Sequence, residues 1–417
     1  MNALLHHIEA ALASVPRESD FLPWLLGDQE AAIRAGTPLV MFSAGQIGKE
    51  LCQTLDFLGI HPTCFCDNSP AKVGGTYEGL PVISFDQLLA EHRQSLVFIA
   101  TQAHFTAVKN QLLEAGFPRE KILGRILDLG TPFNFMSSLL HTQMTLFRHT
   151  LKEKSFLDLY RQDGAKIEAA FNLLEDEKSR TLFMDKLVLI ASEGNVELYK
   201  KFILTHSEPL RLGMGPSSKA GELHCYFHND VISLQPDEVY VDIGAFDGDS
   251  IHSFIDSCTQ RGISYRYIHA LEPDPVCFQN LLANTRNCSR LSCHQLGAWS
   301  HSGTLRFLSS GKAHLDTNGA ICELGDIEIK VVSLDDFLSG PITFIKMDPP
   351  GNVMSEVLRG AARLITRNRP KLAVGAYHSP STLYELPLLV NELCPDYKLY
   401  LRHNAWCINE TDLFATM

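Results

Sequence analysis

The sequence contains no apolar run of the roughly 20 residues that a helix needs to span a bilayer. It also has no excess of positive charge, because 36 Lys and Arg stand against 48 Asp and Glu and give a formal net charge of −12 at pH 7. Nucleic-acid phosphates and anionic membrane surfaces would repel such a chain. We therefore expect neither nucleic acid nor a membrane among its partners, and a small or uncharged ligand instead.

The 11 cysteines lack the spacing of a metal site, since no C-x-x-C pair accompanies a second pair or paired histidines. We expect no bound metal, and thiols that stay reduced. Residues 1–16 carry no Lys or Arg ahead of their apolar stretch, so they do not predict a signal peptide. These features together predict a cytoplasmic protein.

A chain of 417 residues is too long for one ordinary core, so we expect more than one domain. Residues 1–130 are predicted to form a helix over residues 1–35 and then a Rossmann-like α/β domain, because short apolar runs alternate with amphipathic stretches. Residues 131–222 show helical periodicity, with a loop at 213–221. This helical connector can pack the two domains together or pair with another copy of the chain in a homo-oligomer. Residues 223–417 are predicted to form a second α/β domain.

Seven short apolar runs in the last domain predict the strands of one sheet. They lie at residues 239–242, 267–271, 292–296, 343–347, 371–374, 398–401 and 411–414. A short loop joins the last two runs, which predicts that the final strand is reversed. The expected fold is a seven-stranded, doubly wound α/β sheet.

The stretch VYVDIGAFDGDS, residues 239–250, carries most of the functional information. A buried strand ends at Asp242, and Gly244 and Gly248 lie between it and a helix. Glycine allows backbone angles that are closed to other residues and lets a ligand approach the main chain. The free N–H groups at the start of the helix can bind such a ligand. The spacing G-x-x-x-G lacks the third glycine of dinucleotide-binding folds.

A second element, HALEPDP at residues 269–275, places Glu272 just past the end of the next apolar run, followed by Pro273. A carboxylate at this position can accept hydrogen bonds from two ribose hydroxyls, which suits an adenosyl cofactor. A glycine bend after one strand and an acid after the next therefore predict a cofactor site at the carboxyl edge of the sheet.

With these elements in order, the sequence resembles the FkbM-type methyltransferase family over roughly residues 226–416. The resemblance also rests on YFHNDVISL, VVSLDDFL, FIKMD, LRGA, PKLAVGAYH, YKLYLRHN and ETDLFA, which run in the family's order. It implies a class I methyltransferase fold, S-adenosylmethionine as cofactor, and O-methylation of a saccharide or small metabolite. It further implies that Asp242, Gly244 and Gly248 shape the methionine side of the cofactor pocket. Glu272 would then hold the ribose, and Asp348 would stand beside the transferring methyl.

The segment that follows Asp348 departs from the family pattern. Family members usually carry D-x-E-G-x-E, whereas residues 348–353 read DPPGNV and lack both glutamates. The D-P-P-Y motif of amino-group methyltransferases needs an aromatic residue to stack on a base, and Gly351 cannot supply one. The missing carboxylates leave a second interpretation open, in which the chain is a catalytically degenerate binding protein with a methyltransferase fold.

Methyl transfer from a sulfonium is an in-line displacement, so the protein must align donor and acceptor and remove the acceptor's proton. The candidates for this base are Asp348, His378 in GAYHSP and His403 in LRHN. His378 follows a strand at the edge where α/β sites lie. It can equally cap the strand end, and Asp348 can equally hold a loop, so structural roles for both stay open.

The front domain carries FSAGQIG at residues 42–48, with Asp67 at the end of the next strand. It resembles a weakened Rossmann fingerprint of the small domains found in sugar-nucleotide-handling proteins, with Ser43 in place of the first glycine. In one interpretation Gly45, Gly48 and Asp67 bind a nucleotide-type ligand; in the other the domain is a scaffold. The Ser43 side chain stands where a pyrophosphate needs close approach, so tight NAD binding is not expected. An oxidoreductase or epimerase is also disfavoured, because no Tyr-x-x-x-Lys pair follows at a suitable place.

Overall fold

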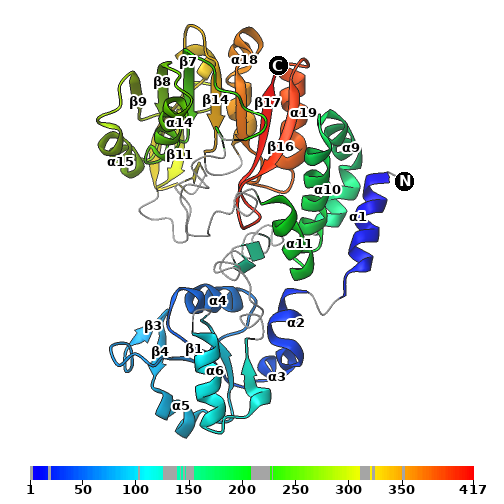
Figure 1. Cartoon of the computed structure of the whole chain (residues 1–417), viewed down its shortest axis with the longest axis vertical. Coiled ribbons are helices and arrows are strands. Elements are labelled where there is room, and N and C mark those ends of the chain that lie inside the picture. The colour runs from blue at the N-terminus through cyan, green and yellow to red at the C-terminus, as the bar shows by residue number, and fades with distance from the viewer. Residues whose placement is uncertain are drawn as a thin grey trace. The chain divides into compact units, whose positions relative to one another are not determined.

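The computed structural model describes residues 3–16, 20–101, 104–124, 139–140, 142–143, 146, 155–207, 226–227, 229–309, 320–321, 325–349 and 353–417. The chain forms two compact units (Figure 1). We call residues 7–157 and 188–205 the front unit, and residues 1–6, 158–187 and 206–417 the C-terminal unit. The predicted domain boundaries at residues 130 and 222 lie outside the described residues and stay predictions.

The front unit is built on a six-stranded sheet of order β3-β4-β2-β1-β5-β6. Its strands are β1 (Leu39–Phe42), β2 (Cys64–Cys66), β3 (Thr76–Tyr77), β4 (Leu80–Ile83), β5 (Leu96–Ile99) and β6 (Ile122–Leu123). Neighbouring strands are parallel except for the pair β3 and β4. Helices α4 (Gln46–Phe57), α5 (Phe85–Glu91) and α6 (Phe105–Glu114) connect them. A parallel sheet with crossover helices confirms the Rossmann-like prediction.

The single helix predicted over residues 1–35 is wrong. The chain instead forms α1 (Ala3–Ser14), α2 (Phe21–Leu26), a 3₁₀ turn (Gly27–Gln29) and α3 (Glu30–Arg34). Pro16 follows the end of α1, and Gly27 caps α2 with φ of +56°. Proline cannot continue a helix and glycine readily takes left-handed angles, so both interrupt an otherwise helical pattern.

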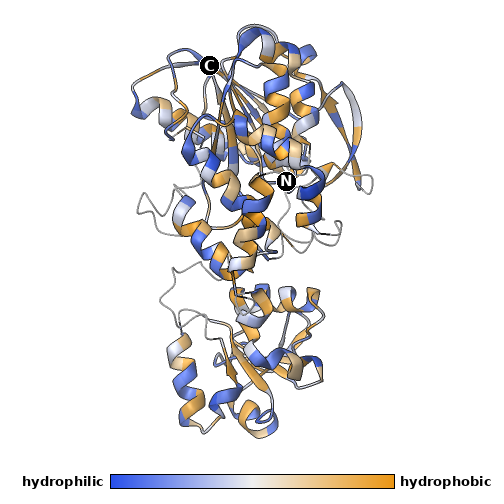
Figure 2. Ribbon diagram, turned by 90° about the vertical axis from the view of Figure 1, so that its right-hand side faces the viewer, coloured by the Kyte–Doolittle hydropathy of each residue, from blue (hydrophilic) through white to orange (hydrophobic). Residues whose placement is uncertain are grey.

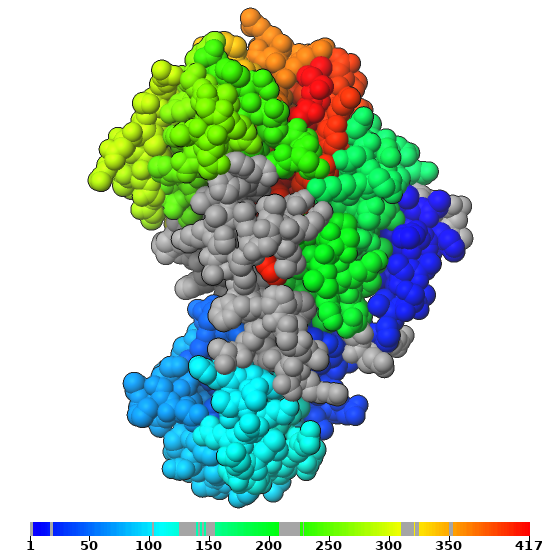
Figure 3. Space-filling model, in the orientation of Figure 1, coloured from blue at the N-terminus to red at the C-terminus, as the bar shows by residue number. Residues whose placement is uncertain are grey.

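The predicted connector is mostly helical where the structure describes it, apart from the turns between helices and a bridge between Leu174 and Leu399. It forms α8 (Phe156–Gln162), α9 (Gly164–Leu173), α10 (Glu177–Ala191) and α11 (Val196–His206). Helix α9 packs against α19 (Thr382–Leu393), and the two lie side by side in Figures 1 and 3. Tyr384 on α19 donates a hydrogen bond to Asp163 at the start of α9, 2.8 Å away. The loop predicted at residues 213–221 lies outside the described residues.

The C-terminal unit contains a seven-stranded sheet of order β16-β17-β15-β14-β7-β8-β9. The strands are β7 (Glu238–Ile243), β8 (Tyr265–Leu271), β9 (Leu291–His294), β14 (Phe344–Met347), β15 (Lys371–Gly375), β16 (Lys398–His403) and β17 (Thr411–Thr416). Only β17 runs antiparallel to its neighbours. All seven predicted strands and the reversed last one are confirmed.

Helices cover both faces of this sheet (Figure 1). They are α14 (Asp249–Gln260), α15 (Pro275–Thr285), α16 (Leu334–Phe337), α17 (Met354–Arg359), α18 (Ala362–Asn368) and α19. Every residue of β7 is buried, as expected for a parallel strand with both faces covered. The core beside it is aromatic: the Tyr240 and Phe254 rings stack at 4.6 Å, and Phe227 meets both edge-on. Figure 2 shows the apolar strands inside and the polar residues on the outer helix faces.

A second, four-stranded sheet was not predicted. It has the order β10-β13-β11-β12, from β10 (Gly297–Ala298), β11 (Gly303–Leu308), β12 (Ala320–Ile321) and β13 (Ile327–Val332). It lies in the chain between β9 and β14 and has a small core of its own around Phe307, Ile329 and Val331. Because β7, β8, β14 and β15 are parallel, their carboxyl ends meet at one edge of the main sheet, where α/β sites form.

Candidate functional site

The bend after β7 has three residues with positive φ: Gly244 (+74°), Phe246 (+48°) and Gly248 (+94°). A side chain on Gly244 would bring Cβ to 2.9 Å from the backbone of Asp348 and Pro349. A side chain on Gly248 would come within 2.7 Å of Thr285 on α15. Glycine is therefore needed at both positions for two reasons. The backbone angles are ones that other residues rarely adopt, and the close packing of the bend leaves no space for a side chain.

Glu272 lies directly against this bend. Its two carboxylate oxygens accept hydrogen bonds from the backbone N–H of Phe246 at 2.9 Å and of Asp274 at 2.8 Å. The residue is only 6% exposed, and burial raises its pKa to about 7 in spite of these donors. The two sequence elements that predicted a cofactor site are thus in direct contact.

A cavity of about 580 Å³ lies at the ends of β8 and β9 and begins at Pro273, the residue after Glu272. It is lined by Pro273, Pro275, Cys293, His294, Gln295, Leu296, Glu328, Ile329 and Lys330. Of the predicted cofactor residues, Pro273 is the one that borders it. The unpredicted second sheet supplies the other wall through β13. This volume lies within the range of about 300–1,000 Å³ that small-molecule sites occupy.

Asp242 lies under the bend and has no exposed surface. Its carboxylate accepts a 2.6 Å hydrogen bond from the Ser250 hydroxyl, and Lys346 Nζ lies 3.2 Å from its other oxygen. Lys346 also donates to the Gly244 carbonyl at 2.9 Å. Burial raises the pKa of Asp242, while the Lys346 charge and the Ser250 hydrogen bond oppose that rise. Asp242 therefore fixes the bend from behind, as part of a buried ion pair.

Asp348 follows β14 and is the centre of a second group, which we call the Asp348 cluster. Tyr226 donates to Oδ2 at 3.1 Å, Tyr377 reaches both oxygens at 2.9 Å, and His378 Nε2 lies 3.0 Å from Oδ1. Burial alone would raise the pKa of Asp348, but the His378 hydrogen bond and the Lys346 charge hold it below its ordinary value. The side chain is 16% exposed, so an ionised carboxylate stands near the surface of this edge.

Gly375, the last residue of β15, makes room for this cluster. A Cβ at Gly375 would lie closer than 3.0 Å to Asp348 Oδ1, at 3.2 Å from Tyr377 Cε1 and at 3.3 Å from His378 Nε2. The Asp348 carboxylate therefore sits over the bare face of Gly375. Two of the predicted bases, Asp348 and His378, are brought together here.

The third predicted base, His403, lies elsewhere. It ends β16, which β17 and β15 separate from β14, and it is 1% exposed. Its Nδ1 lies 2.9 Å from Thr411 Oγ1, and Lys186 from α10 bonds the same hydroxyl. Burial and the Lys186 charge lower the pKa of His403 well below its ordinary value. His403 thus interacts with Thr411 on β17 and with the backbone of Ala405 and Cys407 in the loop between β16 and β17.

Arg402, beside His403, joins three parts of the C-terminal unit. It is 2% exposed, and its guanidinium contacts Asp230 at 2.6 Å and Asp176 at 2.7 Å. It also donates to Ser179 on α10 at 3.0 Å. Because Asp230 lies four residues after Tyr226, this fork fixes the segment that brings Tyr226 to Asp348.

In the front unit, the Asp67 carboxylate already has hydrogen-bond and ion-pair partners within the same unit. The backbone N–H groups of Ala44 and Ser69 donate to its carboxylate at 2.9 Å each, and Lys72 Nζ lies 3.0 Å away. Ser43, at the first fingerprint position, has φ of +105°, an angle that favours glycine. A side chain on Gly48 would collide with the Ser43 carbonyl, so Gly48 serves the close packing of α4 on the turn. Gly45 precedes α4 with an ordinary φ of −133°.

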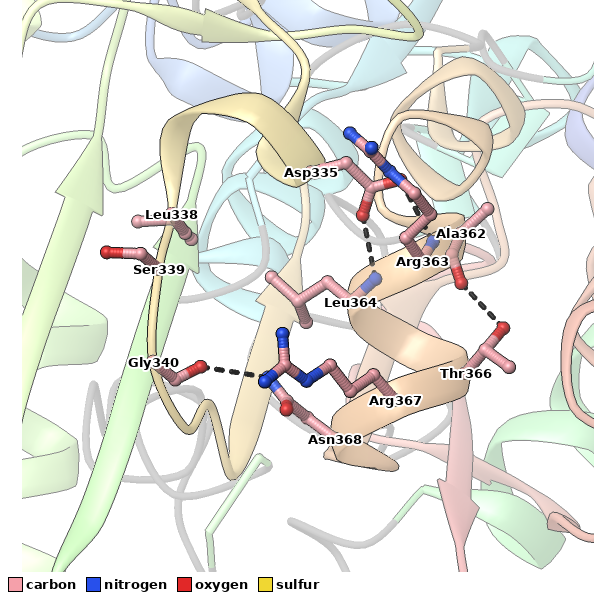
Figure 4. Close-up of a pocket in the computed structure, with 10 residues that line it drawn as sticks. All are labelled: Asp335, Leu338, Ser339, Gly340, Ala362, Arg363, Leu364, Thr366, Arg367 and Asn368. Carbon is pink, nitrogen blue, oxygen red and sulfur yellow. Dashed lines mark hydrogen bonds and ion pairs between the residues drawn. The ribbon is translucent and has the colours of Figure 1, made fainter.

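A cavity of about 640 Å³ lies away from these groups (Figure 4). Two of its lining residues, Gly340 and Asn368, lie a few residues before the starts of β14 and β15. The cavity is therefore at the amino ends of these strands. Asp335, from the VVSLDDFL motif, accepts from the backbone N–H groups of Arg363 and Leu364 at 2.9 and 2.7 Å. That motif residue therefore fixes the start of α18 and lies apart from the predicted site.

Sequence reasoning missed Tyr226, Tyr377 and Lys346 as members of the site. Each lies inside a motif that carried the resemblance, but its role depends on contacts with Asp348 and Asp242 that only the fold creates. The Pro350–Asn352 part of the departure lies outside the described residues. Within the described ranges, no three His, Cys, Asp or Glu side chains gather as metal ligands, and no helix is long and apolar enough to cross a membrane.

Comparison with known proteins supports this description. Residues 242–400 match the family model of the methyltransferase FkbM domain. Among solved structures, the chain is similar to methyltransferase FkbM from Methylobacillus flagellatus KT, with 20% identity, a TM-score of 0.64 and coverage of 99% of both chains. Comparison with curated proteins gave no match.

Two further solved structures show weak likeness, and neither contributes to the argument. Precorrin-6y C5,15-methyltransferase from Geobacter metallireducens GS-15 has 13% identity and a TM-score of 0.26, over 44% of this chain and 79% of that one. Fibrillarin from Aeropyrum pernix, in complex with natively bound S-adenosyl-L-methionine, has 10% identity and a TM-score of 0.30, over 47% of this chain and 73% of that one.

The strand order with its reversed β17 defines the C-terminal unit as a class I methyltransferase fold. The family match then identifies residues 242–400 as a methyltransferase FkbM domain, which confirms the resemblance seen in the sequence.

Proposed function

We propose that the protein is an S-adenosylmethionine-dependent methyltransferase that methylates a hydroxyl of a saccharide or small metabolite, with the cytoplasm as its location. The observation that carries this proposal is the meeting of three elements at one sheet edge. They are the glycine bend, the Glu272 carboxylate and the Asp348 cluster. The acceptor class follows the FkbM family.

The residues at this edge fit an adenosyl cofactor. Each oxygen of Glu272 accepts one backbone N–H, so the carboxylate keeps acceptor capacity for ribose hydroxyls. The 580 Å³ cavity beside Pro273 offers space for a base between Pro273 and His294. Gly244 leaves main chain partly exposed at the bend, whereas Gly248 is buried against α15 and supports the bend by close packing. Asp242 is fully buried and committed to Ser250 and Lys346, so it would support the cofactor through the bend and not by contact.

When bound, S-adenosylmethionine supplies an electrophilic methyl group. The protein's own part is to orient the acceptor and remove its proton. His378 is bonded through Nε2 to Asp348, an arrangement in which the carboxylate orients the ring and leaves Nδ1 for the acceptor's proton. Asp348 then stabilises the protonated ring by its charge. His403 is buried on β16, which β17 and β15 separate from β14, and it is the weakest of the three proposed bases.

One observation favours the second candidate, a catalytically degenerate binding protein. Both oxygens of Asp348 already accept hydrogen bonds from the protein's own side chains, which leaves Asp348 little capacity to act as a base itself. For the front unit, the occupied carboxylate of Asp67 favours a scaffold over a nucleotide site at Gly45 and Gly48.

Two measurements on the full chain test the proposal. Calorimetry with S-adenosylmethionine should show binding that Glu272→Ala weakens at least tenfold. The control Glu356→Ala, which removes a carboxylate paired with Arg359 on α17, should not change it. Labelled methyl donor is then offered with a panel of saccharides and hydroxylated metabolites. Transfer supports the enzyme, binding without transfer supports the degenerate binding protein, and absence of binding rejects both.

A further inference from the structure

A buried carboxyl outside the predicted site, Asp412 on β17, faces the Asp348 cluster from behind. In the antiparallel pair of β15 and β17, Asp412 lies directly opposite Gly375. Directly opposite residues project to the same face with their Cβ positions about 5 Å apart. Asp348 Oδ1 occupies the place where a Gly375 side chain would lie. Gly375 therefore leaves the space between the two carboxyls free of a side chain of its own.

Asp412 is poorly provided with partners for a charged group. It has no exposed surface, and Asn404 donates to its Oδ2 at 2.8 Å. Its Oδ1 is buried and has no hydrogen-bond partner among the described residues. Burial of an ionised carboxylate with a bare oxygen costs far more than burial of a neutral acid.

The charged and titratable groups around Asp412 come from every neighbouring element. They are Lys346, Asp348, Tyr377 and His378 from β14, β15 and the loops after them, Arg402 and His403 from β16, Glu410 before β17, and Lys186 from α10. The charges of Lys186 and Lys346 oppose the rise in its pKa, but the hydrogen bonds and ion pairs described for Lys346, Lys186 and Arg402 are with other groups. Lys346 bonds Asp242 and Gly244, and Lys186 bonds Ile408 and Thr411. Arg402 bonds Asp176 and Asp230.

We propose that Asp412 is a positioning residue that stays a neutral carboxylic acid behind Asp348, so that the cluster holds a single carboxylate charge. Asp348, with its donors Tyr226, Tyr377 and His378, carries that charge. The two carboxyls thus divide into one anion and one acid, as neighbouring carboxyls in active sites do. Burial, with the Asp348 charge next, raises the pKa of Asp412 to about 8, while that of Asp348 is lowered. The positioning role rests on the proposed methyl transfer, whereas the charge state does not.

The charge state is tested by stability against pH. A carboxyl whose pKa is raised in the folded protein binds a proton that the unfolded chain releases, so stability falls as pH rises between the ordinary value and about 8. From pH 5 to 7 the unfolding constant of the wild type should therefore rise about tenfold per pH unit relative to Asp412→Asn, which cannot titrate. The control Asp256→Asn, at an exposed position of α14, should leave the wild-type slope unchanged. Parallel curves for wild type and Asp412→Asn would overturn the inference.

A second measurement observes the carboxyl group directly in the wild-type protein, and the variant serves only to assign it. Wild-type protein labelled with ¹³C only in aspartate carboxyl groups should show one resonance that titrates near pH 8 and disappears in Asp412→Asn. If no aspartate resonance titrates above neutral pH, Asp412 is not held neutral and the inference fails.

The positioning role is tested by turnover once an acceptor is known. Asp412→Ala should lower kcat at least tenfold without changing the KM for the methyl donor, and Asp412→Asn, which copies the shape of the neutral acid, should recover most of that loss. The alkaline fall of kcat near pH 8 should be absent from Asp412→Asn. Equal kcat for the alanine and asparagine variants would refute the positioning role. Absence of any methyl transfer, with the predicted stability slope intact, would refute the proposed function alone.

Discussion

Substitution of Gly375 by alanine should disturb the Asp348 cluster with little other change. Gly375 has an ordinary φ, so the backbone accepts alanine and only space is lacking. The new Cβ would overlap Asp348 Oδ1, which must retreat by roughly 1 Å to reach the 3.4 Å where ordinary contact begins. A misplacement of about 1 Å near the chemistry costs about 100-fold in rate, and overpacking of a buried site costs about 1–3 kcal/mol of stability.

Three assays separate these effects. Thermal unfolding should show a midpoint lowered by about 2–4 °C per kcal/mol, methyl transfer should fall about 100-fold in kcat, and calorimetric donor affinity should stay within about twofold. The matched control is Gly303→Ala on β11, where the nearest atom, in His301, would lie 3.9 Å from Cβ. Wild-type stability and turnover in Gly375→Ala would refute the argument that Asp348 must sit over a bare position of β15.

Three further predictions concern the bend and the front unit. If Glu272 holds the ribose as proposed, its ionised form should bind best. With its pKa at about 7, donor affinity measured by calorimetry should rise about tenfold from pH 5.5 to 6.5 and level off above pH 8; a flat profile would contradict this. By the same linkage, the contribution of Glu272 to folding falls as pH rises toward 7. Asp242→Ala leaves the Lys346 ammonium buried without its carboxylate partner, so urea unfolding should show a loss of about 3–5 kcal/mol in the free energy of unfolding. Donor binding should also be lost, because the bend loosens. Unchanged stability would show that Asp242 does not fix the bend. Ser43→Gly relieves a positive φ and should stabilise the front unit by about 1 kcal/mol, seen as a higher unfolding midpoint.

The main sheet could be predicted because its central strands β7, β14 and β15 are mostly apolar runs whose residues are almost all buried. Glu272 could be placed against the bend after Asp242 because parallel neighbouring strands end at the same edge. The contact of Phe246 with Glu272 follows from that geometry. The strands and the position of the site were therefore accessible from local patterns.

Other features depend on contacts that leave no local signal. Tyr226 reaches Asp348 across 122 residues of chain, and no periodicity indicates such a contact. In the second sheet, the two-residue strands β10 and β12 are too short for a recognisable alternation, whereas the alternation in β13 was a local signal that sequence reasoning missed. His403 was grouped with Asp348 because both follow strands, but its own strand lies at the opposite side of the reversed β17. The helix over residues 1–35 failed because one proline and one glycine outweigh a favourable apolar spacing.

The Arg402 fork has a mechanical consequence. The buried Arg402 guanidinium forms ion pairs with Asp176, which immediately precedes α10, and with Asp230, which follows Tyr226. The backbone of Arg402 belongs to β16. Because the guanidinium is rigid and planar, a movement of one carboxylate partner must change the geometry of its ion pair with the other. A tilt of α10 would therefore be transmitted to Tyr226, whose phenol donates a hydrogen bond to Asp348.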